Sequence, residues 1–215
     1  MGRRYTSMTT KGFSTNSGIF STGSNFKDRF VPDYKKLKKI IDHCKGMGLK
    51  IVLTQGTYDM VHIGHARYFE EAKKHGDLLV VGVDSDKKVR LRKGPDRPLV
   101  PQEERLEMVV HLRPVDVVTI KEHNMPKWHL IKTVRPDVLI VTKETVEKYG
   151  KKKLKEMKAF CGQIKILEPQ ATTSTSAKIR RMQLGLAKRF EKALIPKIAD
   201  MISVTLNGNT GYKRK

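Results

Sequence analysis

Five short runs dominated by apolar residues are spaced along the chain, at residues 51–53, 78–83, 115–120, 138–141 and 164–167. Runs with so few polar interruptions predict strands that are buried on both faces of a sheet. Between the runs, apolar residues recur every three or four positions, which predicts helices that each bury one side. This alternation of strand and helix, with short connections, predicts an α/β fold in which a parallel sheet of about five strands carries helices on both faces.

Composition divides the chain into three parts. Residues 1–30 are expected to form a flexible arm, because residues 1–27 are rich in Ser, Thr and Gly, hold no acidic residue and show no apolar periodicity. Residues 31–182 are expected to form the sheet domain. Residues 183–215 are expected to supply a C-terminal helix and a basic tail.

A glycine-bearing loop follows the first predicted strand and leads directly into a helix. Gly56 lets the backbone approach a ligand closely, and Gly64 keeps the first N–H groups of the helix clear of side chains. Those N–H groups and the positive end of the helix dipole form a seat for phosphate. His62 and His65 fall on the same side of the first turn. A plain strand-to-helix turn with two surface histidines is the alternative, but the combination favours a phosphate site.

Two further segments supply candidates for anion binding. Arg92 and Lys93 lie beyond the carboxyl end of the predicted strand 78–83, the edge at which open α/β sheets bind ligands. The hydroxyl-rich residues 172–176 precede a helix expected to start near Ala177, and its N-terminus can hold a second phosphate. A solvated basic loop and ordinary helix capping are the respective alternatives.

Several motifs occur together in a fixed order, which is more specific than a single glycine fingerprint. They are Gly56-Thr57-Tyr58-Asp59 with His62-Ile63-Gly64-His65, Gly76-Asp77 before residues 78–83 with Asp84-Ser85-Asp86, Lys93-Gly94-Pro95-Asp96-Arg97-Pro98 with Pro101-Gln102-Glu103-Glu104-Arg105, Arg113-Pro114-Val115-Asp116, Arg135-Pro136-Asp137-Val138 and Thr173-Ser174-Thr175-Ser176. This set resembles the signature of the nucleotidyltransferase superfamily, and in particular of its cytidylyltransferase-like family, over roughly residues 50–182.

The resemblance implies a Rossmann-like fold and nucleotidyl transfer, in which a phosphate group attacks the α-phosphorus of ATP or CTP and pyrophosphate leaves. It implies Mg²⁺ bound with the nucleoside triphosphate, without direct protein ligands. The implied catalytic residues are His62, His65, Lys93 and Arg105. The implied nucleotide-binding residues are Gly56, Thr57, Tyr58, Asp59, Gly64, Arg92, Arg113, Ser174, Thr175 and Ser176. Lys127 is assigned to the acceptor.

Departures from the family patterns leave the base and the acceptor open. The spacing from Lys93 to Pro101 is similar to that of heptose-phosphate adenylyltransferases, which use ATP, and the same region resembles archaeal FAD synthetases. Residues 169–172 lack the arginine that is usual in cytidylyltransferases acting on glycerol phosphate, phosphocholine or phosphoethanolamine, and residues 142–144 replace a Gly-Asp element. The expected acceptor is a phosphorylated sugar or alcohol. The alternatives are an FMN adenylyltransferase and an enzyme with altered or lost activity.

The basic excess lies mostly outside the motif-bearing core. The chain has 44 Lys and Arg against 22 Asp and Glu, a net charge of +22. Residues 1–50 hold 11 basic and 3 acidic residues, and residues 178–215 hold 10 and 2. Such flanks favour an anionic partner such as nucleic acid or an acidic surface, although a general solubilising charge explains them equally well. A protein that retains the fold and binds nucleic acid or an assembly through these flanks is the alternative function.

Cysteine, membrane and motif signals narrow the remaining classes. Cys44 and Cys161 have no paired spacing for a disulfide scaffold or a zinc site. No apolar run approaches the roughly 18 residues that a membrane span needs, and a cytoplasmic protein is expected. The chain has no Walker A loop, no His-Glu-x-x-His motif and no Gly-x-Ser-x-Gly elbow. The family resemblance also suggests a homodimer.

Overall fold

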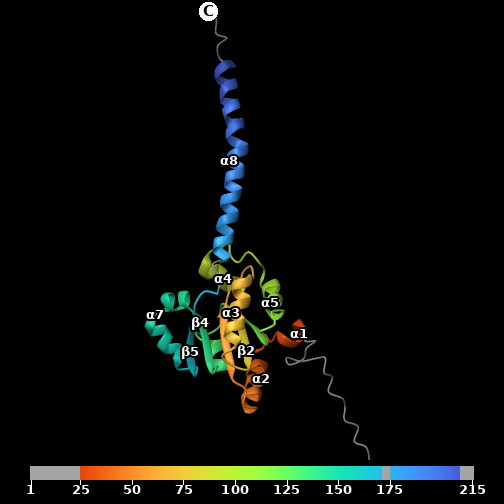
Figure 1. Cartoon of the computed structure of the whole chain (residues 1–215), viewed down its shortest axis with the longest axis vertical. Helices are drawn as coiled ribbons and strands as arrows, with labels where there is room; N and C mark the ends of the chain where they lie inside the picture. The colour runs from red at the N-terminus through yellow and green to blue at the C-terminus, as the bar shows by residue number, and fades with distance from the viewer. Residues whose placement is uncertain (1–24, 171–174, 209–215) are drawn as a thin grey trace, which may run out of the picture. The chain divides into compact units, whose positions relative to one another are not determined.

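A computed structural model describes residues 25–170 and 175–208 of the chain. The chain divides into two compact units, residues 1–172 and 173–215, which are described separately. The first unit contains a sheet covered by helices, and the second contains a long helix (Figure 1).

Five parallel strands form the sheet of the first unit. In chain order they are β1 (Ile51–Gly56), β2 (Leu78–Asp84), β3 (Val117–Lys121), β4 (Val138–Thr142) and β5 (Gln163–Leu167). They lie side by side in the order β3-β2-β1-β4-β5, and each neighbouring pair is parallel. The predicted Rossmann-like parallel sheet of about five strands is therefore confirmed.

Helices cover both faces of this sheet. The helices of the first unit are α1 (Phe26–Arg29), α2 (Tyr34–Gly46), α3 (Ile63–Lys73), α4 (Asp86–Lys93), α5 (Gln102–Val110), α6 (His129–Val134) and α7 (Lys143–Lys158). On one face, α3 and α5 contribute Phe69 and Leu106 to an apolar core. On the other face, α2, α6 and α7 contribute Leu37, Ile131 and Met157 to a second core. The sheet therefore lies between two apolar layers.

The strands supply alternate side chains to these two cores. In β1, Val52 belongs to the core under α3, whereas Ile51 and Leu53 belong to the core under α2. All seven residues of β2 are buried, because this strand has neighbours on both sides and helices over both faces. Burial on both faces explains why the sequence shows apolar runs instead of alternation of polar and apolar residues.

Residues 25–30, at the end of the segment expected to be a flexible arm, have defined structure. Asn25 caps α1: its side chain accepts a hydrogen bond from the Lys27 N–H at 2.9 Å, and Asp28 completes a capping box. Phe30 then forms a bridge with Val118 of β3. The rest of the expected arm, residues 1–24, lies outside the described residues.

Two short helices begin near the carboxyl ends of β2 and β3. The basic segment that leaves β2 forms α4, with Ser85 as its N-cap. The helix α6 follows Lys127 and begins at His129, because Trp128 has a left-handed backbone with φ of 61°.

The second unit contains α8 (Thr175–Gly208), a single helix of 34 residues with Pro196 inside it. The sequence predicts a helix start near Ala177 and a helix over residues 184–202, and the structure joins these segments. The large apolar side chains of α8 are exposed. None of the helices in the described part of the chain is long and apolar enough to cross a membrane.

Candidate active site

The path of the chain through the sheet reverses between β1 and β4. The chain runs from β1 to β2 and β3 on one side, and then returns to place β4 and β5 on the other. The helix after β1 covers one face of the sheet, and the helix after β4 covers the other. Because the connections after β1 and β4 leave toward opposite faces of the sheet, a crevice remains between them at the carboxyl ends of the strands. Open α/β sheets bind ligands at such a crevice.

The loop between β1 and α3 is shaped by Tyr58. Tyr58 and Met60 have positive φ angles of 51° and 55°. The Tyr58 ring folds back, so that a Cβ atom on Gly56 would lie 2.9 Å from its Cζ atom. The ring is buried beside Phe69, and this burial raises the pKa of Tyr58 well above its usual value. The glycine at position 56 makes room for this tyrosine, and the ligand approach expected there stays a prediction.

His62 and His65 lie together at the N-terminus of α3. His62 is the N-cap: its Nδ1 accepts a hydrogen bond from the Gly64 N–H at 3.1 Å, and its own N–H donates to Nδ1 of His65 at 3.3 Å. The two rings stack, with centroids 4.0 Å apart. Tyr58 meets His65 edge-on at 5.5 Å. Because each Nδ1 accepts a hydrogen bond, each neutral ring carries its proton on Nε2, the tautomer in which Nε2 is a donor.

Asp59 ties the segment after α4 to the loop after β1. Its carboxylate is 2% exposed, accepts hydrogen bonds from the N–H groups of Leu99 and Val100 at 3.0 Å each, and pairs with Arg97 at 2.7 Å. These contacts hold the protein's own loop, and the nucleotide contact expected for Asp59 stays a prediction.

Arg105 is among the largest fully buried side chains, with 1% of its surface exposed. Its guanidinium donates to the backbone oxygens of Val100 at 2.9 Å, Asp84 at 2.9 Å and Thr57, and to the carboxylate of Asp86 at 2.7 Å. Four of its five N–H donors can be assigned to these acceptors. Arg105 therefore connects the segments that surround the crevice, and its catalytic contact to phosphate stays a prediction.

A buried carboxylate at the end of β2 gathers three cations. Asp84 oxygens lie 2.9 Å from a nitrogen of Arg92, 3.2 Å from Lys121 and 3.9 Å from Lys88. Burial raises the pKa of Asp84, but the three cations outweigh burial and hold this pKa below its usual value. Burial lowers the pKa of Lys121 to about 8, in spite of the neighbouring carboxylate. With three cations to one carboxylate, this cluster is net positive.

Lys93 is the last residue of α4. Its pKa is lowered by desolvation first and then by Arg92 and Arg97, whereas Glu144 and Asp59 act in the opposite direction. Glu144 belongs to α7, and Asp59 belongs to the loop after β1. Lys93 is therefore within electrostatic reach of the segments that leave both β1 and β4.

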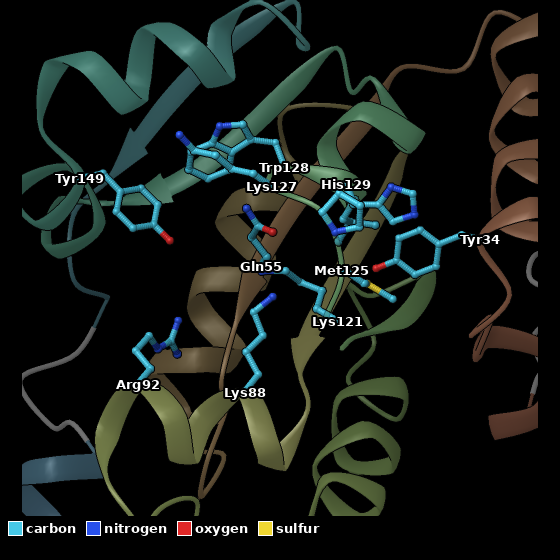
Figure 2. Close-up of a pocket in the computed structure, with 12 residues that line it drawn as sticks. Tyr34, Gln55, Lys88, Arg92, Lys121, Met125, Lys127, Trp128, His129 and Tyr149 are labelled. Carbon is cyan, nitrogen blue, oxygen red and sulfur yellow. The ribbon is translucent and has the colours of Figure 1, made fainter. Parts of the chain in front are cut away.

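A cavity of about 190 Å³ opens beside the Asp84 cluster. Figure 2 shows Gln55 at its centre, with Lys88 and Arg92 on one side and Lys127 and Trp128 on the other. The remaining lining residues are Tyr34, Lys121, Met125, Pro126, His129, Leu130 and Tyr149. The wall is thus built from cations on one side and aromatic rings on the other.

The aromatic wall of the cavity is held by charged side chains. The Trp128 indole N–H donates to the Glu156 carboxylate at 3.0 Å, and Lys127 pairs with the same carboxylate at 2.5 Å. Hydrogen bonds from Lys127 and then Trp128 lower the pKa of Glu156. The Lys127 ammonium lies 5.4 Å from the centroid of Trp128, and the Lys153 ammonium lies 5.3 Å from the centroid of Tyr149. Both rings therefore already contact cations of the protein.

Some predicted residues lie at the far edge of the sheet or outside the described structure. Arg113 is exposed and precedes β3, so it lies at the amino-terminal edge of the parallel sheet, opposite the crevice. Ser174 lies outside the described residues, and nothing is described for the side chains of Thr175 and Ser176.

Gln55 and Lys121 are site residues that the motifs do not mark, and Asp84 belongs to a motif but has no role in the site assigned from the sequence. Each stands at, or one residue before, the carboxyl end of a parallel strand, so polar residues at the ends of apolar runs are the signal that finds them. Tyr34 has no such signal. It enters from α2, where its hydroxyl donates to the Ile120 carbonyl at 3.0 Å. Burial raises the pKa of this hydroxyl.

The reversal of the sheet, the histidine pair at a helix N-terminus and the net-positive crevice define a Rossmann-like α/β protein with a crevice suited to anions. Comparison with known families agrees with this class and narrows it. The cytidylyltransferase-like family matches residues 53–198, and the chain belongs to this family of nucleotidyltransferases.

Relatives match the same part of the chain. Bifunctional protein HldE of Nitratiruptor sp. is 35% identical over 158 residues, which are 73% of this chain and 32% of that protein. Bifunctional protein HldE of Geobacter sulfurreducens is 38% identical over 133 residues, 57% of this chain and 27% of that protein. The chain therefore spans about a third of the length of these relatives.

Solved structures share the fold. The pantoate-beta-alanine ligase of Francisella tularensis, crystallised with beta-gamma ATP and beta-alanine, gives a TM-score of 0.52 at 15% identity, over 69% of each chain.

Proposed function

We propose that this chain is a nucleotidyltransferase, which joins a nucleoside monophosphate from ATP or CTP to a phosphorylated small molecule and releases pyrophosphate. The pair of His62 and His65, stacked at the N-terminus of α3 where the sheet reverses, is the main support for this proposal. Backbone N–H groups and imidazole donors at a helix N-terminus suit phosphate oxygens. Membership of the cytidylyltransferase-like family supports the same reaction.

The reaction needs positioning and charge stabilisation, but no protein nucleophile. An oxygen of the acceptor phosphate attacks the α-phosphorus of the triphosphate. A new P–O bond forms while the bond from the α-phosphorus to the bridging oxygen breaks, and pyrophosphate leaves. His62 and His65 donate hydrogen bonds to α- and β-phosphate oxygens as their charge increases in the transition state.

Mg²⁺ enters this reaction as part of the nucleoside triphosphate substrate. Among the residues that the structure describes, no three His, Cys, Asp or Glu side chains group closely enough to hold a metal ion. Lys93 holds the departing pyrophosphate. Arg105 acts as a positioning residue, because its hydrogen bonds hold the loop after β1 against the start of α4.

The acceptor occupies the cavity beside the crevice. The net-positive cluster around Asp84 suits a phosphate dianion. The aromatic wall is poorly suited to a quaternary ammonium group, because Lys127 and Lys153 already lie over the two rings and would repel it. A sugar or polyol phosphate therefore fits better than phosphocholine. The resemblance of residues 93–101 to heptose-phosphate adenylyltransferases favours ATP and a sugar phosphate.

Nucleotide binding is the first test. Thermal unfolding is followed with ATP and with CTP, each with Mg²⁺, for the wild type, His65→Ala and the matched control His43→Ala. His43 is exposed near the end of α2, on the side of the sheet from which β1 starts. A specific nucleotide should raise the Tm of the wild type and of His43→Ala, but not that of His65→Ala.

Pyrophosphate release is then measured with glucose 1-phosphate, glycerol 3-phosphate and phosphocholine as acceptors. Release with the first two and not with phosphocholine agrees with the cavity. If neither nucleotide shifts the Tm of the wild type, the proposal is contradicted. RNA binding that falls steeply with salt would then favour the alternative of a fold retained for nucleic-acid binding.

A further inference from the structure

The two faces of the sheet are covered by helices of very different charge. Helices α2, α6 and α7, on one face, carry 13 lysines and 4 acidic residues. Helices α1, α3 and α5, which pack against the other face, carry 5 basic and 6 acidic residues. A charge that served solubility alone would be spread over both faces. The outer side of α2, α6 and α7, here called the lysine face, is therefore a candidate surface for an anionic partner.

The charge of the lysine face is available to a partner. Twelve of its 13 lysines are exposed, and Lys45 is half-buried. Within the described part of the chain, ion pairs engage only two of the 13. Lys38 pairs with Asp42 at 2.6 Å, and Lys143 lies 3.9 Å from Glu168. Most of the positive charge on this face is therefore not neutralised by the protein itself.

The lysine face offers a partner almost nothing apolar. Leu37, Ile131 and Met157 are buried against the sheet, and none of the large apolar side chains of α2, α6 and α7, which are described over their whole length, is exposed. Protein interfaces are depleted of lysine and depend on apolar or aromatic anchors. A helix that binds a bilayer inserts apolar side chains, which this face does not present. The remaining partner is an extended polyanion, which lysines bind through phosphate charge alone.

A hollow of about 330 Å³ interrupts the lysine face where α2, α6 and α7 end. It is lined by Lys45, Arg135 and Phe160, together with Pro136, Asp137, Ala159, Cys161 and Gly162. Lys45 donates to the Arg135 carbonyl, and Lys158 donates to the Gly162 carbonyl. These two ammonium groups offset the partial negative charge of the carbonyl oxygens, which would otherwise repel an anion.

Arg135 adds a further cation to this hollow. It is exposed, and its guanidinium forms no ion pair with the residues that the structure describes. It precedes β4 and so lies at the amino-terminal edge of the sheet, away from the crevice. A flexible single strand can place a phosphate or an unpaired base in the hollow, whereas a duplex is stiff and a bilayer is flat. A single strand therefore fits this surface better than either.

We propose that the lysine face binds single-stranded nucleic acid through its phosphodiester backbone. The strand runs across α2, α6 and α7 and contacts Arg135 at the hollow. This inference is independent of the reaction proposed above, because it involves no residue of the crevice.

Fluorescence anisotropy with the full chain tests the proposal. The probes are single strands of uridylate and of thymidylate, each about 20 nucleotides long, and a DNA duplex of the same length. The face variant is Lys39→Gln/Arg135→Gln/Lys151→Gln/Lys155→Gln. The α8 variant, Lys178→Gln/Lys188→Gln/Lys192→Gln/Lys197→Gln, is the matched control, because it removes the same charge from exposed positions of the second unit. Thermal unfolding checks that both variants fold.

The wild type should bind both single strands with similar affinity, because RNA and DNA share the phosphates that lysines contact. Each phosphate contact on a single strand contributes about 0.7 to the slope of log K against log salt. The face variant should therefore lose up to about 3 from this slope. At about 50 mM salt its affinity should be at least about tenfold below that of the α8 variant.

Three results would overturn the proposal. The first is no binding of either single strand by the wild type at low salt; sedimentation with phosphatidylglycerol vesicles would then show whether a bilayer is the partner. The second is a loss in the face variant no greater than in the α8 variant, since total charge, the crevice or the second unit would then explain the binding. The third is tighter binding of the duplex than of the single strands.

Discussion

Replacement of Arg105 by methionine tests whether this residue builds the site or contacts the nucleotide. Methionine fills similar space without donors, so three backbone oxygens lose hydrogen bonds from a charged group. Hydrogen bonds to charged groups contribute about 1.5–3 kcal/mol each, and breaking a buried ion pair costs about 3–5 kcal/mol. Asp86 is partly exposed and keeps Arg90 at 3.7 Å, so the low end applies. We expect the free energy of unfolding to fall by about 3 kcal/mol.

Urea unfolding without nucleotide measures this loss for the wild type and Arg105→Met. In a separate thermal unfolding experiment, the Tm should fall by roughly 6–12 °C for a chain of this size. The control is Arg113→Met, an exposed arginine at the opposite edge of the sheet, which should change stability by less than about 0.5 kcal/mol. If Arg105→Met unfolds like the wild type and loses only the stabilisation by nucleotide, Arg105 is a phosphate ligand, and the role assigned from its hydrogen bonds is refuted.

Three further predictions concern the histidine pair, the buried lysine and the packing of the sheet. His65→Ala should lower turnover about a hundredfold to a thousandfold, as loss of one donor to a transition-state oxygen does, and near-normal pyrophosphate release would exclude this role. The KM for the acceptor should rise above about pH 8, where Lys121 loses its charge in the folded protein. An unfolded lysine has a higher pKa, so between about pH 8 and that pKa the unfolded chain binds more protons than the folded protein. The free energy of unfolding of the unliganded protein should therefore rise with pH over this range. Lys121→Met should flatten both the KM profile and the stability profile. Gly76→Ala should destabilise by about 1–3 kcal/mol in chemical denaturation, because its Cβ would lie 2.6 Å from the Lys50 carbonyl oxygen, whereas Gly46→Ala meets nothing within 4 Å and should not.

The sheet and the position of the crevice follow from the sequence alone. Apolar runs such as residues 78–83 can satisfy burial only between two layers, and the helical spacing between the runs supplies those layers. The loop from Gly56 to His65 is also a local feature, because a glycine-bearing turn from strand to helix places its histidines on the first helical turn whatever surrounds it. The strands of the sheet and the loop from Gly56 to His65 are determined by residues that are close in the sequence. Sequence patterns therefore predict them directly.

Only the tertiary structure decides which charged residues face the ligand and which hold the protein together. Arg105 and Asp59 occupy motif positions, yet they are buried and bind acceptors and donors from segments 20 to 50 positions away. Tyr34 reaches the cavity from a helix that precedes the sheet, and Lys121 meets Asp84 only because β3 lies beside β2. A long polar side chain can form hydrogen bonds or ion pairs with a ligand or with other groups of the protein. The choice depends on which oxygens and nitrogens the folded chain brings within about 3 Å, and spacing along the sequence does not encode that.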